Sequence, residues 1–97
     1  MLINKGYSSG DVVSFKLVNG DEVVAKIVEQ TADGFTISKP CTVVPGPQGG
    51  LGLVQSLFSG DINKDIAIKN EHIMFHSVTT SEIEKHYLKT TTGIQLV

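Results

Sequence analysis

The stretch that decides the fold is VVSFKLVNGDEVVAKIVEQ, residues 12–30. In its first seven residues, apolar side chains alternate with Ser14 and Lys16, which is the period of a strand with one buried face. Residues 22–30 repeat this alternation after Asn19-Gly20. An Asn-Gly pair between two such runs is the strongest short signal for a β-hairpin, because a type I′ turn needs positive φ at both central residues. The stretch therefore predicts an antiparallel hairpin.

Short apolar runs and turn residues continue along the chain in the manner of a small β domain. Ala32-Asp33-Gly34 predicts a turn, and the six residues from Pro45 to Gly50 include two prolines and three glycines, which a central strand does not tolerate. The further predicted strands are residues 35–44, which Lys39-Pro40 bends or interrupts, 51–58, 66–68 and 73–78. The pattern predicts a mainly β fold.

One helix is predicted near the C-terminus, over residues 81–92. Ser81 and Glu84 match a capping box at its start, and Gly93 follows as a stop. Residues 94–97 are an apolar tail, which we expect to pack on its own domain, with docking on a neighbouring subunit as the alternative. The predicted apolar stripe of the helix consists of Ile83, Tyr87 and Leu88.

Length and composition indicate a single globular domain. Ninety-seven residues, 40% of them hydrophobic, leave little room for a second core. Eight basic against ten acidic residues argue against a protein that coats nucleic acid by charge alone. The single cysteine, Cys41, excludes an internal disulfide and fits a reducing compartment. No apolar run approaches the roughly 18–20 residues of a membrane helix, and no signal peptide is recognisable, so we expect a cytoplasmic protein without membrane partners.

Four patterns that begin like chemical sites fail, either on their spacing or because a required residue is missing. The run from Asp61 to Asp65 begins like a calcium loop but lacks the later glycine and glutamate. His72 and His76 on a strand would lie about 13 Å apart, too far to share an ion. The glycines within residues 46–52 lack the lysine and hydroxyl residue of a phosphate loop, and Cys41 has no activating base. We therefore expect no enzymatic activity, no metal and no cofactor.

Two segments resemble the motifs of Sm-like proteins, the Sm, LSm and Hfq family. Residues 15–27, FKLVNGDEVVAKI, resemble the first motif, with Ala25 where the family usually has glycine. Residues 66–73, IAIKNEHI, resemble the second motif, with Lys69-Asn70 at its Arg-Gly or Lys-His position. The turn at residues 31–35 departs from the family, because it lacks the Asp and Asn pair whose Asn reads RNA bases. The N-terminal helix of the family is also missing, and a helix near residues 81–92 takes its place.

The resemblance implies a five-stranded, strongly bent Sm-like barrel over residues 11–78, and an SH3-like barrel would give much the same pattern. A loose arm (residues 1–10) precedes the barrel, and the helix with its apolar tail (residues 79–97) follows. Apolar strands at both ends of the barrel predict a homo-oligomeric ring, since such strands pair across subunits in Sm-like folds. Residues 91–96 also resemble the tail of short proteins from viruses of marine cyanobacteria, which implies a host cytoplasm.

The resemblance implies one function, and the departures from it leave a second one open. In the first, the ring binds single-stranded nucleic acid, RNA in particular, with Lys69 contacting a phosphate or base edge and Asn70 hydrogen-bonding a base. In the second, the chain is a protein-interaction or assembly module, such as a viral structural or adaptor part, that binds no nucleic acid. The first is the leading hypothesis, and the net negative charge, the missing Asp and Asn pair and the presence of only six aromatic residues to stack bases support the second as the alternative.

Overall fold

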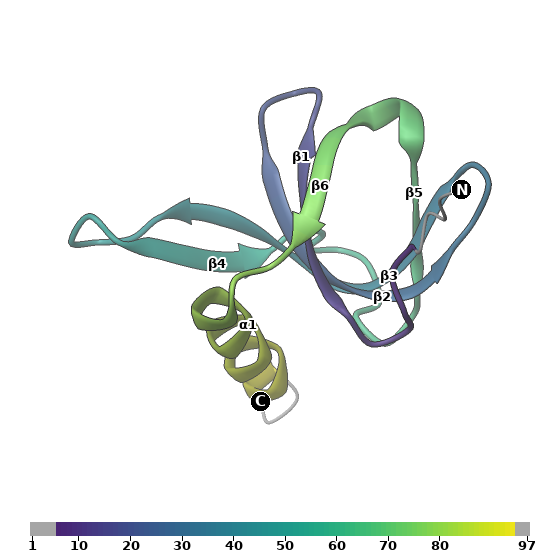
Figure 1. Ribbon diagram of the computed structural model, residues 1–97. Coiled ribbons are helices and arrows are strands. Elements are labelled where there is room, and N and C mark those ends of the chain that lie inside the picture. Colours follow the sequence, from purple (N-terminus) through teal and green to yellow (C-terminus); the bar gives the residue numbers. More distant parts are fainter. Residues whose placement is uncertain (1–5, 95–97) are drawn as a thin grey trace.

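The predicted hairpin is present in the computed structural model, which describes residues 6–94 (Figure 1). Strands β1 (Val12–Leu17) and β2 (Glu22–Gln30) pair antiparallel. The expected type I′ turn is wrong, however, because Gly20 has φ +98° whereas Asn19 does not have positive φ. Hydrogen bonds from Gly20 N–H to the Leu17 carbonyl and from Leu17 N–H to the Asp21 carbonyl instead close a three-residue loop, in which only one residue needs the left-handed region.

Strand β3 (Gly34–Pro45) is one long strand, and the predicted bend at Lys39-Pro40 is a β-bulge. Lys39 and Pro40 together stand opposite Ala25 of β2, and Lys39 has φ +50°. A second irregularity places Val28 of β2 as the extra residue. Bulges increase the local twist and bend the strand that carries them. The two halves of β3 therefore run in different directions and serve different neighbours.

The remaining strands flank this bent ribbon. Strand β4 (Leu51–Gln55) pairs with the second half of β3, and β5 (Ile66–Lys69) pairs with the first half. After the 3₁₀ turn η1 (Asn70–His72), strand β6 (Ile73–Val78) pairs with β1. The strand order is thus β4-β3-β2-β1-β6, with β5 beside β3. The fourth strand ends at Gln55, three residues earlier than predicted.

The sheet is strongly bent but is not a closed barrel, so the predicted closure is wrong. Among residues 6–94, the end strands β4 and β6 each pair with a single neighbour, β3 and β1 respectively. Figure 1 shows the physical reason: beyond its bulge, β3 carries β4 away from the body of the sheet as a projecting hairpin. The mainly β class with one C-terminal helix is confirmed.

Among the described residues, two hydrophobic cores lie on opposite faces of the same sheet. Residues that are adjacent in the sequence belong to different cores: Val12 and Val24 belong to one core, while Val13 and Ala25 belong to the other. The first core consists of Val13, Phe15, Ala25, Ile27, Phe35 and Ile37. The second core consists of Val12, Val24, Cys41 and Tyr87, with Val43, Leu53 and Ile83 at its margin.

Helix α1 (Ser81–Ile94) covers the second core (Figure 1). The predicted cap at Ser81 is wrong by one residue: the backbone N–H of Ile83 donates to the side-chain oxygen of Thr80 over 3.4 Å, so Thr80 is the N-cap. Tyr87, predicted on the apolar stripe, is completely buried, and its hydroxyl donates to the carbonyl oxygens of Ser38 and Lys39 over 3.1 and 2.9 Å. The helix is therefore fixed to the bulge of β3.

The described part of the predicted arm, residues 6–10, is attached to the sheet. The backbone N–H of Gly10 donates to the carbonyl of Ile27, and the hydroxyl of Tyr7 lies 2.7 Å from Nδ1 of His76. Residues 1–5 and the tail residues 95–97 lie outside the described residues. No helix in the described range is both apolar enough and long enough to cross a membrane.

Candidate functional site

The predicted pair Lys69 and Asn70 lies where β5 ends and η1 begins, and both side chains are exposed. The backbone N–H of Asn70 donates to the carbonyl of Asp33 over 2.8 Å, and its Nδ2 donates to the carbonyl of Ala32 over 3.3 Å. Lys69 stands opposite Gly34 in the register of β3 and β5. The structure thus places the two residues side by side, attached to the turn between β2 and β3.

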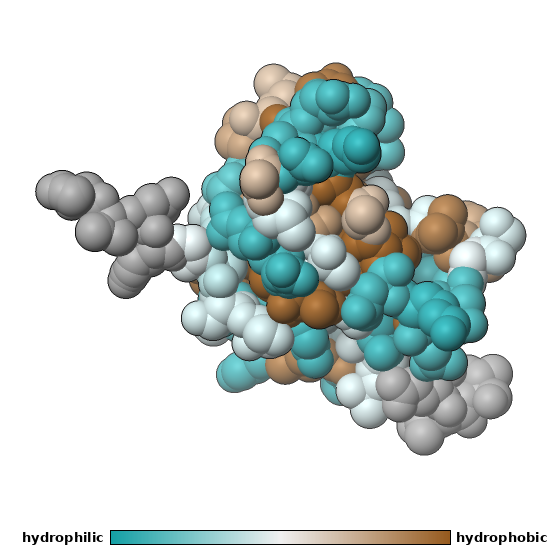
Figure 2. Space-filling model, turned by 90° about the vertical axis from the view of Figure 1, so that its right-hand side faces the viewer, coloured by the Kyte–Doolittle hydropathy of each residue, from teal (hydrophilic) through white to brown (hydrophobic). Residues whose placement is uncertain are grey.

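The charges around this turn are mixed. Among the residues that the structure describes, Lys69 is the one cation lining an open surface depression that also includes Asp33, Asn70 and Glu71. Figure 2, which views the molecule from this side, shows mainly hydrophilic side chains in its upper part and apolar atoms towards the middle. A ligand would meet one positive charge, two carboxylates and an amide that already donates to Ala32. One such turn in a single chain is therefore a weak anion site.

The two end strands of the sheet form a second candidate site, which no predicted site residue marks. Nine large apolar side chains in the described range are exposed, and seven of them lie on β4, directly after it, or on β6. The seven are Leu51, Val54, Leu57, Phe58, Met74, Phe75 and Val78. We call Leu51 to Phe58 the β4 edge and Met74 to Val78 the β6 edge. Neither edge contains Asp, Glu, Lys or Arg.

The geometry of β6 leaves its apolar side chains in solvent. Its register with β1 shifts beside Lys16, so that Met74 has no direct partner and forms a bulge. Phe75 lies opposite Lys16 and is 62% exposed. Val78 lies opposite the buried Val13 yet is equally exposed. Within residues 6–94 only β1 pairs with this strand, so its other backbone edge is unpaired.

The signal for these edges was present in the sequence. Residues 51–58 and 73–78 contain no charged side chain, whereas edge strands of monomeric proteins usually carry charges or prolines that prevent pairing with other chains. Apolar end strands were part of the ring prediction. Which strands are the ends, and which of their side chains face solvent, depends on the bulges of β2, β3 and β6, and these had no sequence signature beyond Lys39-Pro40.

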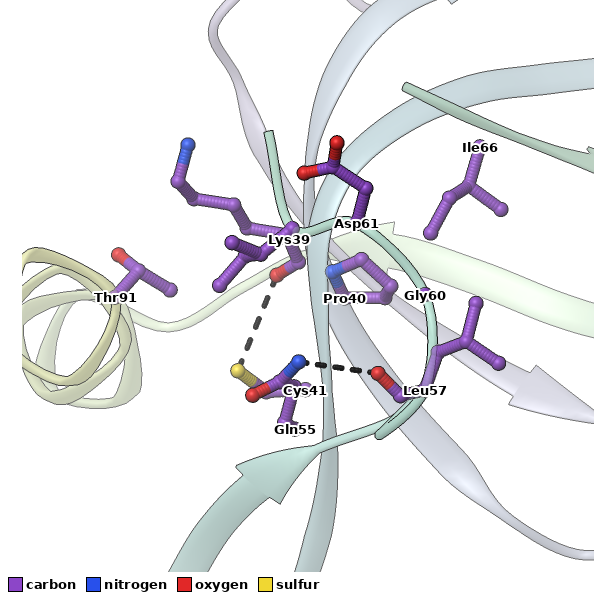
Figure 3. Close-up of a pocket in the computed structure, with 10 residues that line it drawn as sticks. Lys39, Pro40, Cys41, Gln55, Leu57, Gly60, Asp61, Ile66 and Thr91 are labelled. Carbon is purple, nitrogen blue, oxygen red and sulfur yellow. Dashed lines mark hydrogen bonds between the residues drawn. The ribbon is translucent and has the colours of Figure 1, made fainter. Parts of the chain in front are cut away.

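A small apolar pocket lies between the bulge of β3, the residues after β4 and α1 (Figure 3). Cys41 lines it together with Pro40, Leu57 and Ile66. The Cys41 thiol is buried and lies 3.9 Å from the Lys39 carbonyl, and burial raises its pKa. A raised pKa disfavours the reactive thiolate. The Cys41 thiol is therefore buried and disfavoured as a nucleophile.

Two of the patterns set aside in the sequence, the acidic run and the glycine-rich run, form ordinary turns. Asp61 accepts a hydrogen bond from the Asn63 N–H through Oδ1 and one from the Lys64 N–H through its carbonyl. Gly46 N–H donates to the Gly50 carbonyl and closes the hairpin loop between β3 and β4. Across the described range, no group of three or more His, Cys, Asp or Glu side chains is placed to hold a metal ion.

A scan against protein-family models gives no match for this chain, and a search of curated proteins gives no significant match. Function is therefore inferred from the two candidate sites themselves.

Proposed function

We propose that this chain is an assembly module of the Sm-like kind, in which the β4 edge of one copy pairs with the β6 edge of the next and the copies close into a ring. The observation that carries the proposal is the absence of charged residues from both end strands, combined with their exposed apolar side chains. We infer a role in binding or assembly and not in catalysis. The setting we propose is the cytoplasm, that of the host if the source is a virus.

Two physical arguments support assembly. An unprotected strand edge offers a row of unpaired N–H and C=O groups to any other edge. A domain of this size is also only modestly stable alone, and burying apolar edges between copies adds to its stability. Pairing β4 with β6 joins two different surfaces, and such head-to-tail contacts close into rings when the rotation permits.

The oligomeric state tests this function directly. We expect light scattering after size exclusion to give about five to seven chains per particle at micromolar concentration. Phe75→Lys places a charge on the β6 edge and should release monomers of 10.4 kDa. Val18→Lys is the matched control, since Val18 is also exposed but lies in the β1–β2 turn. A monomeric wild type, or equal effects of the two variants on the oligomeric state, would contradict the proposal.

A second candidate function is the binding of single-stranded RNA at Lys69 and Asn70. Its support is that both side chains are exposed, in a turn whose sequence resembles the second Sm motif. In a ring, one lysine from each subunit would form a circle of positive charge that holds a single strand, even on an acidic protein. Lys69 would contact a phosphate or base edge, and Asn70 would hydrogen-bond a base.

Fluorescence anisotropy with short uridine- or adenine-rich RNA at two salt concentrations tests this second function. Lys69→Ala should weaken binding and lower the salt slope by roughly 0.7 for each lysine lost, while the ring stays intact. Lys85→Ala, which removes an exposed lysine from α1, is the control and should change little. Binding that is absent from wild type at low salt, or equal in the two variants, would leave assembly as the function.

A further inference from the structure

The loop between β4 and β5 interrupts one side of β3. Both strands pair with the same side of β3, β4 along Cys41–Pro45 and β5 along Gly34–Ile37. The chain leaves this line after Gln55 and returns at Ile66. The intervening loop is attached at its start, where the Ser56 N–H donates to the Pro40 carbonyl over 3.0 Å. It is therefore a feature added to the sheet edge and not a connection that the sheet requires.

Contacts within the loop fix how it presents its apolar residues. The side chain of Gln55 donates through Nε2 to the Leu57 carbonyl over 3.0 Å. Leu57 packs over Gly60, where an added Cβ would come within 2.6 Å of the Leu57 side chain. Phe58, between them, is 81% exposed and is the most exposed large apolar side chain of the described range. These contacts hold the residues on either side of Phe58 and leave its aromatic ring in water, available to insert into a partner.

We propose that Phe58, supported by Leu57, docks on Met74 and Phe75 of β6 in the neighbouring copy. This inference rests on the proposed pairing of the β4 edge with the β6 edge. Antiparallel pairs are the commoner arrangement, and in such a pair the residues that follow β4 lie beside the beginning of the partner's β6. Met74 and Phe75 stand there, at the beginning of β6, both largely exposed.

The chemistry of the two surfaces is complementary. An aromatic ring against Phe75 and the Met74 thioether makes two contacts that proteins favour, aromatic on aromatic and sulfur on aromatic. Opposite charges flank them, because Asp61 follows Phe58 in the loop and Lys16 is the cross-strand neighbour of Phe75. A second copy of this chain therefore offers apolar side chains that match these and an opposite charge beside them.

The association constant of the assembly measures the contribution of Phe58. Phe58→Ser removes an exposed side chain, so the monomer should fold as wild type by circular dichroism. We expect assembly to weaken on the order of ten- to hundred-fold, as for an interface anchor. Val18→Ser, an exposed apolar residue in the β1–β2 turn, is the matched control and should assemble as wild type.

Disulfide trapping gives an independent readout of the contact. Mixing Phe58→Cys with Met74→Cys under mild oxidation should give a covalent adduct of two chains, whereas Phe58→Cys mixed with Val18→Cys should not. The buried Cys41 stays in place and out of reach. If Phe58→Ser assembles normally while Phe75→Lys does not, or if both mixtures cross-link equally, the docking of Phe58 is overturned and edge pairing stands. If wild type is monomeric, both proposals fall.

Discussion

At several positions in this molecule a change of one or a few atoms would disturb the fold, and Gly34 is the clearest case. This first residue of β3 stands opposite Lys69, and a Cβ at Gly34 would collide with the carbonyl oxygen of Ile68. Backbone atoms cannot move aside as a flexible side chain can. The close approach of β5 to β3, and with it the position of the Lys69-Asn70 turn, requires glycine here.

Gly34→Ala should therefore lower the free energy of unfolding by about 2–4 kcal/mol in urea titrations. Gly50→Ala is the matched control: an added Cβ meets nothing within 4 Å in the β3–β4 loop, so its effect should stay within about 0.5 kcal/mol. An equal loss in both variants would contradict this explanation.

The Tyr87 hydroxyl is a second decisive group, because it donates to two carbonyls of the β3 bulge. Tyr87→Phe should cost about 1–2 kcal/mol of unfolding free energy. Tyr7→Phe loses a hydrogen bond to His76 that is exposed to solvent and should cost no more than about 0.5 kcal/mol. Chemical denaturation of wild type, Tyr87→Phe and Tyr7→Phe compares the loss of the buried and the exposed hydrogen bond. A larger loss of unfolding free energy in Tyr7→Phe than in Tyr87→Phe would contradict this prediction.

The same residue predicts the response to alkali. Burial, with Cys41 nearby, raises the pKa of the Tyr87 phenol, so the folded chain holds its proton more tightly than the unfolded chain. That contribution to stability is complete below the unfolded pKa of about 10 and declines as pH rises above it. Unfolding free energies measured between about pH 8 and pH 11 should fall with pH, and should fall less in Tyr87→Phe. A steeper fall in the variant would contradict the raised pKa.

At the scale of elements, the sequence alone predicted the structure correctly where short-range interactions determine it. Alternation in residues 12–30 placed both strands of the hairpin, and the position of Tyr87 predicted a buried helix stripe. The sequence did not predict the structure where contacts between distant segments determine which of several local conformations forms. Ser81 matched a capping box, yet the chain begins the helix from Thr80. The missing closure of the sheet likewise follows from how β3 leaves its bulge, which depends on pairing with β2 and β4.

The candidate sites, too, could be predicted only in part from the sequence. The adjacency of Lys69 and Asn70 follows from their sequence positions alone, but the nearby Asp33 comes from another turn. The exposure of Phe75 required knowledge of the β1–β6 register. The sequence shows which strands lack charged residues, but it does not show which of their side chains are exposed to solvent.

The helix start offers a direct test of the corrected cap. Thr80→Ala removes the side-chain acceptor for the Ile83 N–H and should cost about 0.5–1 kcal/mol of unfolding free energy. Ser81→Ala leaves that bond in place and should stay within about 0.5 kcal/mol. Equal losses, or a larger loss for Ser81→Ala, would restore the capping box as the start of α1.

At the scale of the whole molecule, assembly and folding stability are linked. If copies pair through their edges, mass action stabilises the folded chain as concentration rises. The thermal midpoint of wild type should therefore increase by a few degrees over an approximately hundred-fold range of protein concentration, whereas that of Phe75→Lys should not. A concentration-independent midpoint in wild type would argue against assembly.

The two cores on opposite faces of one sheet have a consequence for the amide hydrogens of β1 and β2. Val12 and Val13 are adjacent and face different cores, and so do Val24 and Ala25. These four residues are almost completely buried, and the first two pair with β2 while the second two pair with β1. Detachment of α1 exposes one face of this segment and leaves the other covered. In hydrogen–deuterium exchange, these amides should therefore exchange most slowly, through global unfolding, while those of α1 exchange earlier through a local opening.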